Sequence, residues 1–153
     1  MRVSDLLEKG FYFKCHVDDS SELYTYINQV LVDSEYVDER FLQAIQKREQ
    51  DFPTGIKTAK MGIALPHVDA DYIKANALLI CTLDPAVEFR RMDDVKTKID
   101  VWIAFILLIK DPHIHIDAIS QLTSVWQSER ILQSIYQAST KAEVMKIIRE
   151  AGL

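Results

Sequence analysis

The chain has 153 residues, the usual length of a single domain. Hydrophobic residues make up 48% of it and charged residues 27%, so it can form a hydrophobic core, and this composition argues against intrinsic disorder. The net charge of −5, without a cluster of Lys and Arg, argues against a nucleic-acid-binding surface.

A membrane-spanning helix needs about 18 apolar residues. The longest apolar segment of this chain, from Val101 to Ile109, is much shorter. Residues Met1 to Gly10 include charged side chains and lack the apolar core of a signal peptide. Cys15 and Cys81 have no metal-type spacing, and we interpret both as buried, reduced cysteines. These features predict one cytoplasmic domain that covers residues 1–153.

Two helices are predicted in the first third of the chain. Asp19 to Glu22 has the pattern of an N-cap followed by an acidic residue, and apolar residues then recur at helical spacing. This pattern predicts a helix from about Ser20 to Asp33. A second helix is predicted from Asp38 to near Gln50, and Pro53-Thr54-Gly55 then forms a turn.

Four apolar segments predict β-strands. They are Phe11 to Val17, Ile63 to Leu65, Ala77 to Leu83, and Val101 to Ile109. The last two are almost continuously hydrophobic, whereas a strand with one solvated face would alternate. Continuous hydrophobicity indicates strands that are covered on both faces, as in an α/β layer fold.

Three helices are predicted after Pro112. The first carries apolar residues on one face, namely Ile116, Ile119, Leu122, Val125 and Trp126. Ser128 begins the second helix, and Ser139 or Thr140 caps the third, which ends before Gly152. The predicted fold is a single compact α/β domain: a mixed β-sheet with helices on both faces and a helical C-terminal third.

One histidine has the setting of a functional residue. The chain contains His16, His67, His113 and His115. His67 follows Pro66 at the end of a predicted strand, where α/β sheets present functional groups, and the proline restricts how the chain leaves the strand. An imidazole with a pKa of about 6.5 is largely neutral at cytoplasmic pH, so one of its ring nitrogens is free to attack phosphorus. A surface or capping histidine is the commoner alternative.

Arg48 and the remaining histidines have less distinctive settings. Arg48 is either a solvated cation at a helix end or a planar group that holds phosphoryl oxygens in two places. His113 and His115 form a His-X-His pattern, which can bind zinc, but no further ligands are grouped nearby. We therefore expect neither a metal nor another cofactor, and we interpret His16 as structural.

An ordered set of motifs extends along the chain from about Phe11 onward. The set comprises Arg48-Glu49, Pro53-Thr54-Gly55-Ile56, Ile63-Ala64-Leu65-Pro66-His67, His115-Ile116, Leu122-Thr123 and Ser139-Thr140-Lys141-Ala142-Glu143-Val144. It resembles the enzyme IIA family of the sugar phosphotransferase system (PTS), in its fructose–mannitol class. The segments Asp51 to Gly55 and Lys110 to His113 are more similar to the galactitol-type branch than to the mannitol type.

The resemblance implies a role for each matching residue. His67 matches the histidine that accepts the phosphoryl group, and Arg48 matches the cation that stabilises this group during transfer. An ungapped register through Leu122 matches His115 to a second active-site histidine, whereas the galactitol-like context matches His113 instead. The expected helical register favours His115 as the histidine that faces His67.

The resemblance also implies the partners of a cytoplasmic phosphoryl carrier. The carrier protein HPr would donate the phosphoryl group, a cysteine of the IIB component would accept it, and the IIC membrane permease would be an indirect partner. The sugar or polyol is expected to be of the galactitol type. We expect the partner face to be a shallow apolar patch that includes Leu65, Val68 and Ile114. The alternative is a regulatory module of the same fold, which senses phosphorylation without a transport role.

Overall fold

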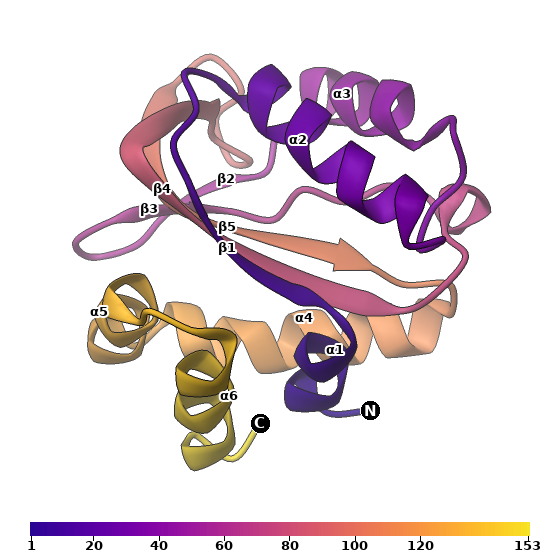
Figure 1. Cartoon of the computed structure of the whole chain (residues 1–153). Coiled ribbons are helices and arrows are strands. Elements are labelled where there is room, and N and C mark those ends of the chain that lie inside the picture. Colours follow the sequence, from indigo (N-terminus) through magenta and orange to yellow (C-terminus); the bar gives the residue numbers. More distant parts are fainter.

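A five-stranded mixed sheet lies between two layers of helices in the computed structural model, which describes residues 1–153 (Figure 1). The strands are β1 (Phe11–Cys15), β2 (Gly55–Lys57), β3 (Gly62–Ala64), β4 (Ala77–Arg90) and β5 (Lys98–Leu108). Their order in the sheet is β1-β4-β5-β3-β2. Strands β4 and β5 form a long antiparallel pair, β1 and β3 are parallel to their neighbours β4 and β5, and β2 is antiparallel to β3.

Helices cover both faces of this sheet, as the sequence predicted. They are α1 (Val3–Lys9), α2 (Ser20–Asp33), α3 (Phe41–Asp51), α4 (Pro112–Trp126), α5 (Glu129–Gln137) and α6 (Lys141–Glu150), with a short 3₁₀ turn, η1 (Ala70–Tyr72). Figure 1 shows α2 and α3 on one face and α1, α4, α5 and α6 on the other. None of the helices combines the length and apolar character that crossing a membrane would require.

The central strands have hydrophobic side chains on both faces. Along β4, Leu79 and Cys81 pack in the core beneath α2 and α3, whereas Leu78 and Ile80 pack in the core beneath the other four helices. Strand β5 alternates in the same way. The continuous hydrophobic runs therefore correctly predicted strands buried on both faces.

The strands extend beyond those runs where their side chains become polar. β4 continues to Arg90 and β5 begins at Lys98, and these two residues form the last pair before the hairpin turn. Glu88 pairs with Asp100 in the same extension. Hydrophobicity indicated only the fully covered part of each strand, because the extension has an exposed face.

Helix boundaries follow the capping residues. Asp19 Oδ1 accepts a hydrogen bond from Glu22 N at 2.8 Å, and α2 has the predicted limits. The predicted start of α3 at Asp38 is wrong, because Asp38 Oδ1 accepts instead from Arg40 N at 2.8 Å and holds the turn before the helix. Ser128 and Thr140 cap α5 and α6 as predicted.

The predicted buried face of α4 is wrong at its first member. Ile116 is 67% exposed, and the buried residues of α4 are Ala118, Leu122, Val125 and Trp126. The first turn of the helix therefore extends past the core. As a result, Ile116 lines an open cavity at the carboxyl end of the sheet.

Parallel pairing of β3 with β5 brings two chain segments together at this end of the sheet. Leu107 N donates to Pro66 O at 3.2 Å, so the residues after β3 continue beside β5. The end of α3 is attached to the same place through Thr54, which donates to Glu49 Oε2 at 2.8 Å and accepts from Leu65 N at 3.3 Å. These bonds hold the α3 terminus against the segment that contains His67.

Gly62 is required for the close approach of β3 to β5. A Cβ atom at this position would overlap the carbonyl oxygen of Asp100. We expect Gly62→Ala to lower the free energy of unfolding by about 1–3 kcal/mol, because the strands must move apart to admit the methyl group. Gly152→Ala is the control: its Cβ meets no atom within 4 Å, so only its positive φ of 83° opposes the change. Urea unfolding measures both, and equal losses would contradict this role of Gly62.

Candidate functional site

His67 is held in one orientation and one tautomer. Its Nδ1 lies 2.8 Å from the carbonyl oxygen of Leu65. A carbonyl oxygen can only accept a hydrogen bond, so Nδ1 carries the proton and Nε2 carries the lone pair. Because Pro66 lies between the two bonded residues, the chain closes a tight local loop around the ring. The structure thus leaves Nε2 as the free nucleophilic nitrogen.

The surroundings of His67 keep its ring neutral. Burial lowers the pKa of His67 below its usual value of 6.5, and the nearby charge of Arg48 lowers it further. The hydrogen bond to Leu65 and the charge of Asp69 act in the opposite direction, but the net shift of the pKa is downward. The ring is therefore neutral at neutral pH, with its one proton on Nδ1, and this is the form that can attack an electrophile.

His115 lies beside His67. The centroids of the two rings are 5.3 Å apart, with 58° between the ring planes. His115 is half-buried in the first turn of α4, and its pKa is lowered by burial and by the proximity of His67 and Arg48. His113, two residues earlier, is exposed and does not line the cavity around His67.

Arg48 brings a positive charge to the same cavity, with donors that lack strong partners. Its Nη1 lies 3.6 Å from Asp69 Oδ1, which is too long for a charge-assisted hydrogen bond. Its Nε is buried without a hydrogen-bond partner. The guanidinium carbon lies 4.9 Å from the ring centroid of Phe52, a cation–π contact that orients the group. Arg48 is thus positioned to bind an anion.

A cavity of about 280 Å³ at the carboxyl ends of β3 and β5 is lined by His67, His115 and Arg48. Lys110, Asp69 and Ile116 also line it. The start of α4 borders the cavity, but its first amides are already bonded. Asp111 Oδ1 accepts from His113 N at 2.7 Å and from Ile114 N at 3.4 Å. The donors available to an anion are therefore side chains rather than the helix terminus.

The structure thus brings together three of the candidate residues, His67, Arg48 and His115. His16 is exposed, and its Nδ1 lies 2.8 Å from the carbonyl oxygen of Asp84, outside this cavity. No group of three or more His, Cys, Asp or Glu side chains is arranged to hold a metal ion. Sequence reasoning did not identify Asp69 and Lys110, because single charged residues in loops carry no distinctive pattern.

The expected apolar patch is partly wrong. Leu65 and Val68 are buried in the core, and Ile114 is only partly exposed. The large apolar side chains that reach solvent near the site are Ile116 and Phe52, the latter 63% exposed. The segment that follows β3 and contains His67 has its apolar side chains, Leu65 and Val68, packed in the core.

Solved structures share this fold at low sequence identity. A protein from Streptococcus pyogenes described as a "putative PTS IIA domain" has a TM-score of 0.81, with 22% identity over 100% of this chain and 99% of that one. Enzyme IIAMTL in its complex with phosphorylated enzyme IIBMTL from Escherichia coli has a TM-score of 0.71, with 19% identity over 92% and 94%. The nitrogen regulatory protein IIA-Ntr from Neisseria meningitidis has a TM-score of 0.75, with 20% identity over 95% and 98%.

Sequence relatives have related descriptions. The galactitol-specific EIIA component of the PTS from Escherichia coli K12 is 27% identical over 117 residues, which are 76% of this chain and 77% of the relative. The mannitol-specific enzyme IIA component from Geobacillus stearothermophilus is 21% identical over 99% of this chain and 100% of the relative. The model of the family described as "phosphoenolpyruvate-dependent sugar phosphotransferase system, EIIA 2" matches residues 6–151. The chain belongs to this EIIA type 2 family of the phosphotransferase system.

Proposed function

We propose that this protein is a phosphoryl carrier that accepts a phosphoryl group from phospho-HPr on Nε2 of His67 and passes it to a cysteine of a IIB component. One observation carries the proposal: a neutral histidine, held through Nδ1, lies in one cavity with Arg48 and His115. Membership of the EIIA type 2 family supports the same reaction class. The carrier would act in the cytoplasm, where its donor and acceptor meet.

The chemistry is an in-line transfer of the phosphoryl group, first from nitrogen to nitrogen and then from nitrogen to sulfur. The lone pair of His67 Nε2 attacks phosphorus, and the bond from phosphorus to the donor histidine breaks, with its electron pair returning to the donor imidazole. Arg48 stabilises the charge on the transferring oxygens, and His115 donates a hydrogen bond to one of them. In the second step, the IIB thiolate attacks phosphorus and His67 leaves as a neutral ring that retains its Nδ1 proton.

The hydrogen bond to Leu65 serves both steps. It fixes the ring before attack, so little orientational freedom is lost in the transition state. It also keeps the proton on Nδ1 while Nε2 carries the phosphoryl group. The protein therefore needs no separate general base, because the attacking nitrogen already has its lone pair.

The substrate assignment rests on the relatives. The galactitol-specific relative, together with the galactitol-like segments near Pro53 and Pro112, favours a carrier for galactitol or a similar polyol. The structural neighbour in complex with phosphorylated IIB supports a IIB component as the acceptor. The IIC permease would then receive the phosphoryl group only indirectly, through IIB.

A regulatory role is the second candidate, because a nitrogen regulatory IIA protein shares the fold. Such a module would be phosphorylated on the same histidine but would not supply a transporter. Transfer from the phosphorylated protein to a purified galactitol-type IIB separates the two functions. Rapid loss of phosphate from this chain and its gain by IIB supports the carrier, and no transfer favours the regulator.

Replacing His67 tests the acceptor assignment. We expect His67→Gln to abolish phosphorylation by enzyme I, HPr and phosphoenolpyruvate, because no other ring nitrogen in the cavity is held with a free lone pair beside Arg48. Intact-protein mass spectrometry measures the added phosphoryl group. His113→Gln is the matched control and should accept phosphate normally. Full phosphorylation of His67→Gln would refute the acceptor assignment.

The planar guanidinium of Arg48 is expected to matter beyond its charge. Arg48→Lys keeps the charge but loses the two-pronged donor geometry, so phosphoryl transfer should slow by roughly ten- to a thousandfold. Quenched-flow transfer from phospho-HPr gives the rate. Lys47→Gln is a suitable control, because Lys47 pairs with Asp51 at 3.0 Å and lies outside the cavity of His67. A wild-type rate for Arg48→Lys would indicate that Arg48 is only a solvated cation at the end of α3.

Of the two histidines at the start of α4, only His115 should affect transfer. Its ring is close enough to His67 to contact a phosphoryl group there, whereas His113 is exposed outside the cavity. We expect His115→Ala to slow transfer and to change the hydrolysis rate of phospho-His67. His113→Ala should leave both rates unchanged. An effect confined to His113→Ala would mean that α4 has a different register in the working protein.

The lowered pKa values predict how stability depends on pH. For His67 and His115, the unfolded chain takes up a proton first as the pH falls below 6.5, so the unfolded state gains stability relative to the native state. The free energy of unfolding should decrease as pH falls from 6.5 through the native pKa values, and His67→Gln should reduce this decrease. NMR titration should give pKa values below 6.5 for both rings and higher values in Arg48→Gln. A His67 pKa above 6.5 would contradict the account.

A further inference from the structure

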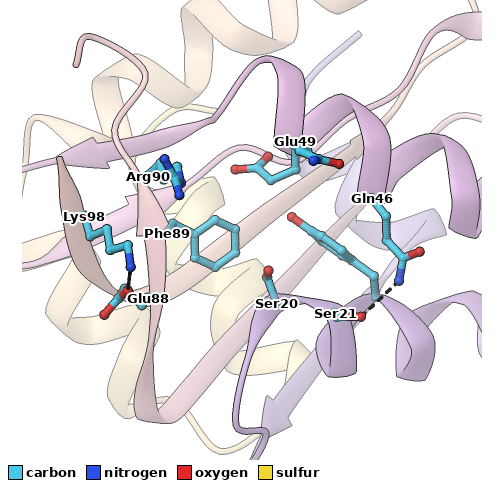
Figure 2. Close-up of a pocket in the computed structure, with 10 residues that line it drawn as sticks. Ser20, Ser21, Gln46, Glu49, Glu88, Phe89, Arg90 and Lys98 are labelled. Carbon is cyan, nitrogen blue, oxygen red and sulfur yellow. Dashed lines mark hydrogen bonds and ion pairs between the residues drawn. The ribbon is translucent and has the colours of Figure 1, made fainter. Parts of the chain in front are cut away.

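A second cavity lies on the other side of the α3 terminus. It has a volume of about 690 Å³ and shares no lining residue with the cavity around His67. Figure 2 shows it between Gln46 and Glu49 of α3 on one side and Arg90 and Lys98, at the end of the β4–β5 hairpin, on the other. The start of α2 completes the wall. We call it the hairpin cavity.

The hairpin cavity contains a buried polar group without a partner. Tyr24 lines the cavity and is only 1% exposed, yet its hydroxyl makes no hydrogen bond in the protein. An unpaired buried hydroxyl destabilises a fold, and nearly all buried polar groups are paired. Burial and the neighbouring Glu49 raise the pKa of Tyr24 well above its usual value, so the hydroxyl keeps its proton and can donate it. The Tyr24 hydroxyl therefore has a donor that a ligand bound in the cavity could satisfy, provided that the ligand reaches past the entrance to the side chain.

The hairpin cavity also has one cation without an ion-pair partner. Arg90 makes only a 3.4 Å contact from Nη1 to Val95 O and has no carboxylate partner. Lys98 differs, because it forms an ion pair with Glu88 at 3.1 Å (Figure 2). Arg90 therefore keeps most of its donors for an anionic group at the mouth of the cavity.

The remaining polar side chains of the hairpin cavity are better suited to hydrogen-bond the hydroxyls of a ligand than to bind a second charged group. Gln46 donates through Nε2 to Ser21 Oγ at 3.1 Å, which leaves its carbonyl oxygen able to accept (Figure 2). Glu49 is engaged by Thr54, and burial raises its pKa. Only two of the ten lining residues are hydrophobic, so an apolar ligand would leave polar groups unpaired. The volume is typical of a site for a small organic molecule and exceeds what a single inorganic ion needs.

We propose that the hairpin cavity binds a small hydroxylated organic anion, with its anionic group on Arg90 and one of its hydroxyls on Tyr24. Phosphorylated polyols and sugar acids share this chemistry. The proposal does not depend on phosphoryl transfer by His67, because the two cavities have separate lining residues.

The test is an NMR titration of the ¹⁵N-labelled protein with mannitol 1-phosphate, gluconate, neutral mannitol and inorganic phosphate in separate experiments. We expect saturable shifts at the amides of Ser21, Gln46 and Arg90 with mannitol 1-phosphate or gluconate, and weaker binding of mannitol and phosphate. The tighter of the two anions identifies the source. The His67→Gln protein should bind equally well, which separates this result from the outcome for the carrier function.

Two variants assign the contacts. Arg90→Gln should weaken anion binding at least tenfold, and the adjacent Arg91→Gln is the control, because Arg91 is engaged by Asp93 at 2.6 Å outside the cavity. Tyr24→Phe removes only the unpaired hydroxyl, so it should fold normally and bind more weakly. No saturable binding of either organic anion would overturn the proposal. Equal binding of inorganic phosphate, unaffected by Tyr24→Phe, would also overturn it and leave a simple anion site.

Discussion

The parallel pairing of β3 with β5 is the contact on which the site depends. β3 has only three residues, yet it places Pro66 and His67 beside the end of β5, from which the chain turns into α4. Parallel strands end at the same edge of a sheet, so the residues that follow them meet there. His67 and His115 are 48 positions apart in the chain and adjacent in space for this reason. Gly62 permits the approach because it has no Cβ atom to meet the backbone of β5.

Arg48 has two consequences for His67. Its positive charge lowers the pKa of the histidine and so favours the neutral, nucleophilic ring. The same charge would stabilise the phosphoryl group once it arrives. Both effects require Arg48 to remain close, and the hydrogen bonds that Thr54 donates to the Glu49 carboxylate hold the end of α3 in place. A charge that suppresses protonation and attracts phosphate would suit the proposed carrier, because no proton would have to move at either transfer step.

The sequence was sufficient to predict the parts of the fold that have local signals. Asp19 marked the start of α2, the hydrophobic runs marked the central strands, and Pro66 at a strand end marked His67. The sequence was insufficient where packing between distant segments determines the local structure. The short α1 and β2 lack a readable period, and Ile116 fits an apolar helical face but lies beyond the edge of the core.

The hairpin cavity illustrates the same limit. Tyr24, Glu49 and Arg90 belong to α2, α3 and β4, and no spacing in the chain relates them. Tyr24 fits the apolar face of α2 by periodicity, and only the structure reveals that its hydroxyl is unpaired. Local patterns predict which residues are buried, whereas the satisfaction of a buried polar atom depends on the complete packing around it.

The position of the phosphoryl group on the imidazole of His67 depends on which ring nitrogen is free. Long-range ¹H–¹⁵N correlation NMR of the phosphorylated protein distinguishes the two ring nitrogens of each histidine. We expect one phosphohistidine, His67, with phosphorus bonded to Nε2 and the proton retained on Nδ1, which donates it to the carbonyl of Leu65. Phosphorus on Nδ1 of His67 would refute the proposed geometry, because the hydrogen bond to Leu65 would then have to break. Phosphorus on another histidine would refute His67 as the acceptor.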